Sequence, residues 1–195
     1  MASEITKLLP FRQYDDNDVI NLFAMDGNNK AAGTIVKVKS GGGNLNQDLI
    51  DLKDDGSEFL HTLGNSYSPL YRNPLEVTTA AEGDVALGIL LRDVRSTDEN
   101  GENLRYYPEK KEELQCVLSG ESVPVATKGV FTFMQGAFSG SVVPAPMTEL
   151  KVSDDGLFSS AGEGSSVGVV LATGIRNSGN GDTHTGLYAI AKINF

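Results

Sequence analysis

The chain lacks most of the residues that catalytic and metal sites commonly use. Its 195 residues include one cysteine, no tryptophan and two histidines, His61 and His184. A single cysteine excludes an intramolecular disulfide, and two histidines cannot supply a histidine-rich metal site. Cys116 has no histidine close to it in sequence, so we expect it to be a small buried hydrophobic side chain rather than an activated thiol.

Long apolar runs and clustered positive charge are also missing. No run approaches the ~20 residues of a membrane-spanning helix, and no apolar segment follows a basic one near residue 1, so we expect neither a membrane partner nor export. The 16 Lys and Arg residues against 26 Asp and Glu residues give a formal net charge of -10. The one tight pair of cations, Lys110 and Lys111, is followed at once by Glu112 and Glu113, so we expect no nucleic acid partner.

Glycine is abundant, with 22 residues, and it recurs in turn-forming clusters such as MDGNNK, SGGGN and NSGNGD. Short apolar or alternating runs lie between these clusters, among them AGTIVKVK, VPVATKGVFTF, SVGVVLATG and GLYAIAKINF. Runs of this length and pattern predict strands, and so an all-β fold, a small β-barrel- or β-sandwich-like domain. At most one or two short helices are expected, at residues 45–52 and 108–118, the second with Pro108 in its first turn.

One stretch matches a nucleophile motif. GSSVG, residues 164–168, has the G-x-S-x-G form, and Asp182 and His184 follow Ser166 in the chain order of a hydrolase triad. That motif works only at a sharp turn from a strand into a helix, whereas the residues after Gly168 continue as a strand. We therefore expect no enzyme activity and no cofactor, and a hydrolase through Ser166 is the weakest of the alternatives.

Two acidic stretches raise the question of a calcium site. In the first, counting from Asp15 or Asp16 places Val19 or Ile20 where a third oxygen ligand should stand, so the pattern fails. The second runs from Asp98 to Glu109.

Between Asp98 and Glu109, Asn100 and Glu102 also occupy ligand positions of an EF-hand-like loop. Asn103 stands where such a loop needs glycine, and strong flanking helices are missing. We interpret the stretch as a solvated loop, and its binding of a cation stays open.

Three segments carry a resemblance to a known family. They are LLPFRQYDDNDVINLFA (residues 8–24), GDVALGILLRDV with GESVPVATKGVFTF (83–94 and 120–133), and ELKVSDDGLFSSAGEGSSVGVVLATG through GLYAIAKINF (149–195). The first resembles the amino-terminal arm of virion structural proteins of tailed bacteriophages. The other two resemble head-decoration, or capsid cement, proteins of the same phages. Residues 95–119 and 44–73 depart from the compact members of that group.

The resemblance implies a β-tulip-type domain that binds the outer surface of the phage head and bridges subunits of the major capsid protein. It implies an extended N-terminal arm over residues 1–25 and a single β-rich domain over 26–195, and the departure at about 95–119 is interpreted as an insert in that domain. Neighbouring copies of the chain would also be partners, as a trimer in preference to a dimer. The protein would be made in the host cytoplasm and reside in the virion. A β-rich receptor- or carbohydrate-binding module of a tail fibre is the alternative.

The arm is the candidate docking segment, and two interpretations of it stay open. Its apolar residues could add a strand to a neighbouring sheet or fill a groove on the capsid, with Asp15, Asp16 and Asp18 forming the turn between them. They could equally pack into the barrel of their own chain. The candidate docking residues are Leu9, Pro10, Phe11, Tyr14, Val19, Ile20, Leu22 and Phe23.

Overall fold

The computed structural model describes residues 7–25, 30–39, 75–176 and 186–195. Within them the protein is all-β, as the strand pattern predicts, with two six-stranded sheets and one two-stranded sheet. We refer to the six-stranded sheets as sheet A and sheet B. The predicted helix at residues 45–52, together with His61, Asp182 and His184, lies outside the described residues.

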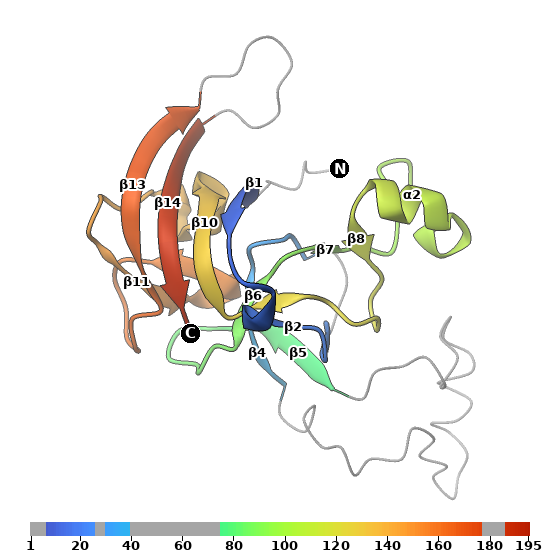
Figure 1. Cartoon of the computed structure of the whole chain (residues 1–195), viewed down its shortest axis with the longest axis horizontal. Helices are drawn as coiled ribbons and strands as arrows, with labels where there is room; N and C mark the ends of the chain where they lie inside the picture. Colours follow the sequence, from blue (N-terminus) through green and yellow to red (C-terminus); the bar gives the residue numbers. More distant parts are fainter. Residues whose placement is uncertain (1–6, 26–29, 40–74, 177–185) are drawn as a thin grey trace, which may run out of the picture.

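Sheet A has the strand order β1-β10-β14-β13-β11-β12, and every neighbouring pair is antiparallel. Strand β10 is central to it because it pairs with β1 on one side and with β14 on the other. The strands are β1 (Leu8–Gln13), β10 (Lys128–Met134), β11 (Glu149–Ser153), β12 (Leu157–Ser159), β13 (Gly168–Arg176) and β14 (Gly186–Asn194). Figure 1 shows β10, β14 and β13 side by side in one curved sheet.

Sheet B has the order β2-β9-β6-β4-β5-β3 and curls back on itself. An isolated bridge joins Ala24 of β3 to Ser122, and the Val123 amide donates to the Phe23 carbonyl at 2.9 Å, which brings β3 beside the chain that enters β9. The sheet is therefore barrel-like. Its strands are β2 (Val19–Ile20), β3 (Ala24–Met25), β4 (Ile35–Val38), β5 (Glu76–Thr79), β6 (Gly88–Leu90) and β9 (Val125–Ala126).

The start of β4 and the whole of β6 in sheet B are buried on both faces. In β4, Ile35 belongs to the main core against sheet A, whereas its neighbour Val36 belongs to a second core with Met25 and Val77. Because successive side chains of a strand point to opposite faces, a strand between two cores must be apolar at every position. This explains why Ile35 and Val36 of β4, and residues 88–91 in and after β6, form unbroken apolar runs.

The main core is built around four phenylalanines. Phe133 lies 4.8 Å from Phe158 and 6.4 Å from Phe138 between ring centroids, and Phe131 lies 6.2 Å from Phe133. All four side chains are buried. Tilted and edge-on rings at these distances are the favoured aromatic geometries, so this cluster joins β10 to β12 and to the turn at residues 135–141.

Residues 95–119 form a small lobe beside sheet B, and the predicted insert thus has a structure of its own. It contains a 3-10 turn (Leu104–Tyr106), the helix α2 (Pro108–Glu113) and β8 (Cys116–Val117), which pairs in parallel with β7 (Asp93–Val94). The helix begins at Pro108, as predicted, but ends five residues earlier than the predicted limit of 118 because β8 starts at Cys116. Figure 1 shows the lobe on the opposite side of the molecule from β13.

The predicted N-terminal arm is part of both sheets. Residues 8–25 contribute β1 to sheet A and both β2 and β3 to sheet B. Each of these three strands pairs with another strand of the same chain, so the segment does not lie free of the sheets. The domain boundary at residue 25 stays a prediction. Residues 1–6 lie outside the described part.

We predict that Phe133→Ala lowers the free energy of unfolding by about 3–5 kcal/mol, because it removes the ring that contacts the other three phenylalanines. Phe11→Ala is the matched control, since Phe11 is 62% exposed and its truncation should change stability by no more than about 0.5 kcal/mol. Urea denaturation followed by circular dichroism measures both. Equal losses in the two variants would contradict this description of the core.

Candidate functional site

The eight candidate docking residues divide into buried and exposed groups. Leu9 is 4% exposed, so it cannot serve as a docking residue without the strand unfolding. Val19 and Ile20 are half-buried in β2, and Phe23 is half-buried against the second core. These four side chains support the interpretation that the segment packs into its own barrel.

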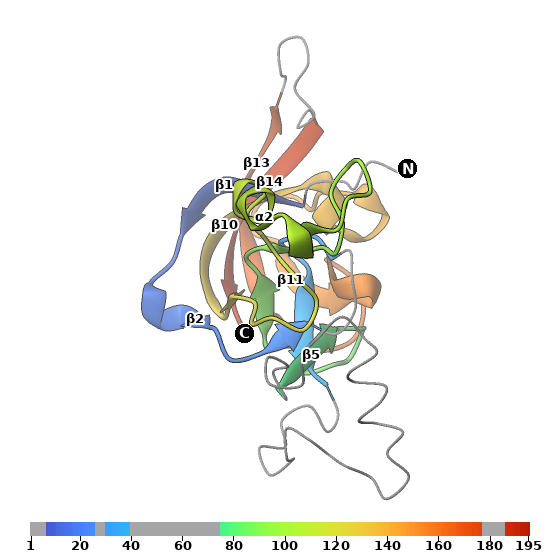
Figure 2. The ribbon, with the colours of Figure 1, turned by 90° about the vertical axis from the view of Figure 1, so that its right-hand side faces the viewer.

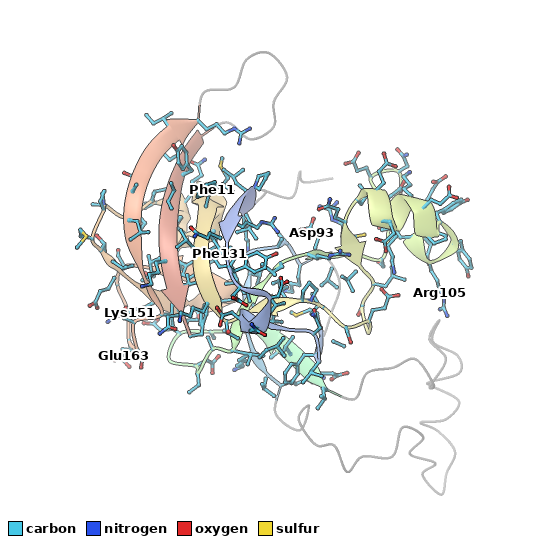
Figure 3. All side chains as sticks on the ribbon, viewed as in Figure 1. Phe11, Asp93, Arg105, Phe131, Lys151 and Glu163 are labelled. Carbon is cyan, nitrogen blue, oxygen red and sulfur yellow. The ribbon has the colours of Figure 1, made fainter. Side chains whose placement is uncertain are left out.

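The other four residues reach the surface. Phe11 is 62% exposed and Leu22 is 61% exposed, and Pro10 is exposed as well. Tyr14 is 39% exposed and stacks on Phe131, with the ring centroids 5.6 Å apart and the ring planes at 13°. Figure 3 labels Phe11 on β1 and Phe131 on the neighbouring β10.

A β-bulge decides which residues of β1 face outward. The pairing register with β10 shifts between Leu8 and Arg12. The Arg12 side chain turns inward: its Nε donates to the Leu9 carbonyl at 3.1 Å and its Nη1 donates to the Leu91 carbonyl at 3.2 Å. Burial lowers the pKa of Arg12, an effect that the charges of Tyr14 and Asp93 oppose. With Arg12 held inward, Pro10 and Phe11 occupy the outer side of an edge strand.

The aspartates after β1 form a turn. Asp15 caps a 3-10 turn (Asp16–Asp18), and its Oδ1 accepts from the backbone amide of Asn17 at 2.9 Å and from its side-chain amide at 2.8 Å. The Asp18 carbonyl accepts from the amide and the hydroxyl of Thr127. The turn predicted for these residues is therefore present. Across the described residues, no three His, Cys, Asp or Glu side chains converge in a group that could hold a metal ion.

The prediction of a solvated loop is confirmed for residues 99–103 and 105–109, which are exposed, but it is wrong for Asp98. Its side chain is 1% exposed. Oδ1 accepts from the backbone amides of Asn100 and Glu102 at 2.9 and 2.7 Å, and Oδ2 accepts from Lys110 Nζ. Lys110 also lies 3.5 Å from Glu102 Oε2. The positive charge facing the would-be calcium ligands is therefore an ammonium group of the same chain.

The lone cysteine lies in this lobe. Cys116 is buried, as expected, in a small cluster with Leu104 and Leu118. Burial raises the pKa of its thiol, with smaller opposing effects from Arg95 and Lys111. A buried thiol with a raised pKa is a poor nucleophile.

Ser166 does not lie at a nucleophile elbow. It is exposed, its Oγ donates to the Gly168 carbonyl at 3.2 Å, and the chain continues from Gly168 into strand β13. The strand predicted after the motif is confirmed. Asp182 and His184 fall outside the described residues, so the structure does not join them to Ser166.

Several apolar residues that are exposed in the structure were not among the candidates predicted from the sequence. Tyr106 and Tyr107 of the lobe are 74% and 49% exposed, and Leu171 and Ile175 of β13 are 44% and 67% exposed. The run VGVVLATGI resembles a strand buried on both faces, and nothing in its composition indicates where the covering sheet ends. A weak signal was available in Thr173 and Arg176, whose polarity is unusual for such a buried strand.

We predict that Asp98→Asn loosens the lobe, because it removes the charge that Lys110 neutralises. The hydrogen bond from Lys110 lowers the pKa of Asp98 below its ordinary value of 3.8. Because the pKa of Asp98 is lower in the folded state than in the unfolded state, its carboxylate stabilises the fold fully above the unfolded-state pKa. This stabilisation is lost as the pH falls through the lower folded-state pKa. In the wild-type protein, the NMR signals of the Asn100 and Glu102 amides that donate to Asp98 should therefore shift with pH, with a midpoint below 3.8.

Glu109→Gln is the matched control for Asp98→Asn, since Glu109 belongs to the same stretch and is exposed. It should leave the thermal unfolding temperature unchanged, whereas Asp98→Asn should lower it. Identical unfolding temperatures, or an Asn100 midpoint at or above 3.8, would contradict the assigned role of Asp98.

No helix in the described residues is long and apolar enough to cross a membrane. Comparison of the chain with known proteins finds no matching family model, no similar curated protein and no similar solved structure.

Proposed function

We propose that the protein is a structural component of a tailed-phage virion that binds the outer surface of the capsid and bridges subunits of the major capsid protein. The observation that carries the proposal is where the resembling segments lie. Residues 83–94 contain β6 and β7, residues 120–133 contain β9 and most of β10, and the last segment contains β11 to β14. The likeness to head-decoration proteins thus falls on strands that build both sheets.

The charge of the chain supports the same proposal. A protein that coats a particle in many copies must remain soluble at high local concentration, and a net charge of -10 opposes non-specific self-association. The proposed stabilisation needs no reaction: each copy buries apolar area between capsid subunits at roughly 25 cal/mol per Å², and many copies add their contributions.

Phe11 and Leu22 are the best docking candidates of the original eight, because both are large, apolar and more than half exposed. Burying one such side chain contributes about 1.5–3 kcal/mol. The neighbouring strands β1 and β2 are paired within the chain, so these two side chains are presented by ordered backbone. Capsid docking would then cost little conformational entropy in the backbone.

The experiment is co-sedimentation of the purified protein with expanded heads that lack it. Wild-type protein should bind saturably. Phe11→Ser and Leu22→Ser should each weaken binding roughly 10- to 100-fold, as expected for losing one buried apolar side chain. Val85→Ser is the matched control, because Val85 is an apolar residue with 92% exposure in the loop between β5 and β6, and its binding should be unchanged.

The experiment tests capsid binding and the choice of docking residues separately. Absence of wild-type binding would reject the capsid proposal. Saturable wild-type binding that survives both serine substitutions would keep the capsid proposal and reject Phe11 and Leu22 as the docking residues.

A second candidate function is receptor or carbohydrate binding in a tail fibre, favoured by one observation. Tyr106 and Tyr107 are adjacent and exposed on the lobe, and aromatic rings are suited to stacking on sugars. Figure 3 shows the neighbouring Arg105 at the outer end of the same lobe. Glycan-array binding that Tyr106→Ala abolishes, without binding to heads, would select this function.

A further inference from the structure

Among the described residues, strand β13 pairs from end to end with one strand only, and that pairing has a bulge between Val170 and Ala172. Its partner β14 covers it from Gly168 to Arg176, whereas β11 pairs with it at Gly168 and Val169. Met147 and Thr148 extend that side by one residue, since the Met147 amide donates to the Val170 carbonyl and the Val170 amide donates to the Thr148 carbonyl. Beyond Val170, no strand in the described part of the chain pairs with this edge.

The end of the β13–β14 pair also extends past the rest of sheet A. Figures 1 and 2 both show the two strands projecting beyond the body of the molecule. Ile175 and Leu187 are opposite each other in the pairing register, and they are 67% and 42% exposed. The uncovered edge is therefore accompanied by uncovered apolar side chains.

The hydrogen-bonding direction along β13 follows from its register with β14. The Asn194 amide donates to the Val167 carbonyl on the β13 side, and the Phe195 amide donates to the Thr127 carbonyl on the β10 side. Because these directions alternate along a strand, Ile190 and Tyr188 also bond toward β13, where they face Ala172 and Gly174. The N–H and C=O groups of Thr173 and Ile175 must then point away from β14, toward the open edge.

After the bulge between Val170 and Ala172, this edge lacks most of the features that prevent strand addition. Edge strands are commonly protected by proline, charge or short length. Strand β1 carries Pro10 and Arg12, and β12 spans only Leu157–Ser159. The segment from Leu171 to Ile175 has neither proline nor a charged residue.

We propose that the open edge of β13 is a self-association surface, where a second copy of this chain adds its own β13 antiparallel about a two-fold axis at Gly174. In this register Thr173 faces the partner subunit's Ile175, and Ile175 faces the partner subunit's Thr173, so the outward-pointing N–H and C=O groups of these two residues find partners. The two copies of Gly174 meet without β-carbons between them. Arg176 faces an alanine rather than another cation, since the register places it opposite Ala172.

The self-complementarity of the edge favours a second copy over an unrelated strand. A two-fold interface requires one surface patch to match itself. Thr173 and Ile175 lie one residue before and one residue after Gly174, so each faces the other when two copies pair about that glycine. The segment also holds none of the 26 acidic residues, so it adds nothing to the repulsion expected from the overall charge. The inference concerns the purified chain alone and does not depend on capsid binding.

The test is sedimentation equilibrium of wild type, Thr173→Pro and Thr173→Ala over a range of concentrations. Wild type and Thr173→Ala should dimerise with similar constants. Thr173→Pro removes an N–H that points to the open side while leaving the β13–β14 bonds of Ala172 and Gly174 in place, so it should weaken dimerisation at least ~10-fold and keep the wild-type unfolding temperature. Ile175→Lys, which adds charge to the edge, should do the same and serves if the proline variant fails to fold.

A cysteine pair tests the register. Residues directly opposite in a hydrogen-bonded pair have Cα atoms ~5.5 Å apart, within disulfide range, and diagonal neighbours are farther apart. Mixed Thr173→Cys and Ile175→Cys chains should therefore cross-link on oxidation far more than either variant alone. Wild-type protein that stays monomeric, dimerisation that survives both edge variants, or equal cross-linking in the mixture and in the single variants would overturn the proposal.

Discussion

The packing of Phe131 and Phe133 from β10 into the main core is the interaction on which the rest of the structure depends. These two rings, with Phe138 and Phe158, fix β10 against the turn at residues 135–141 and against β12. Strand β10 in turn pairs with both β1 and β14, so segments from opposite ends of the sequence are held by the same strand. The bulge in β1 and the exposure of Phe11 follow from that pairing.

This arrangement changes what the N-terminal segment can contribute to binding. A free arm would lose conformational entropy when it docks, whereas a paired strand has already lost it on folding. Among the described residues of the segment, the side chains that remain available lie on the outer side of β1, at residues 14–17 and in the turn after β2. The lobe with Tyr106 and the projecting end of β13 lie on opposite sides of the molecule, so these two surfaces can act independently of each other (Figure 1).

Local sequence features predicted the local structure well. Alternating and apolar runs located strands such as β10, β13 and β14, and Pro108 marked the start of α2. Long-range contacts were not predictable from the same features. Leu9 and Phe11 are two apolar residues of one strand, and a bulge in the pairing with β10 separates the buried one from the exposed one. Arg12 at the bulge contacts the carbonyl of Leu91, which is distant in sequence. Asp98 looked solvated because its partner Lys110 follows twelve residues later and is brought back by the helix.

The most direct test of the account is the temperature at which DNA-filled heads release their DNA, measured as a function of the number of copies bound. The account predicts that this temperature rises steadily with occupancy, because each copy adds its own contact energy between capsid subunits. Saturable binding with an unchanged release temperature would contradict it: the protein would then be attached to the capsid without stabilising it.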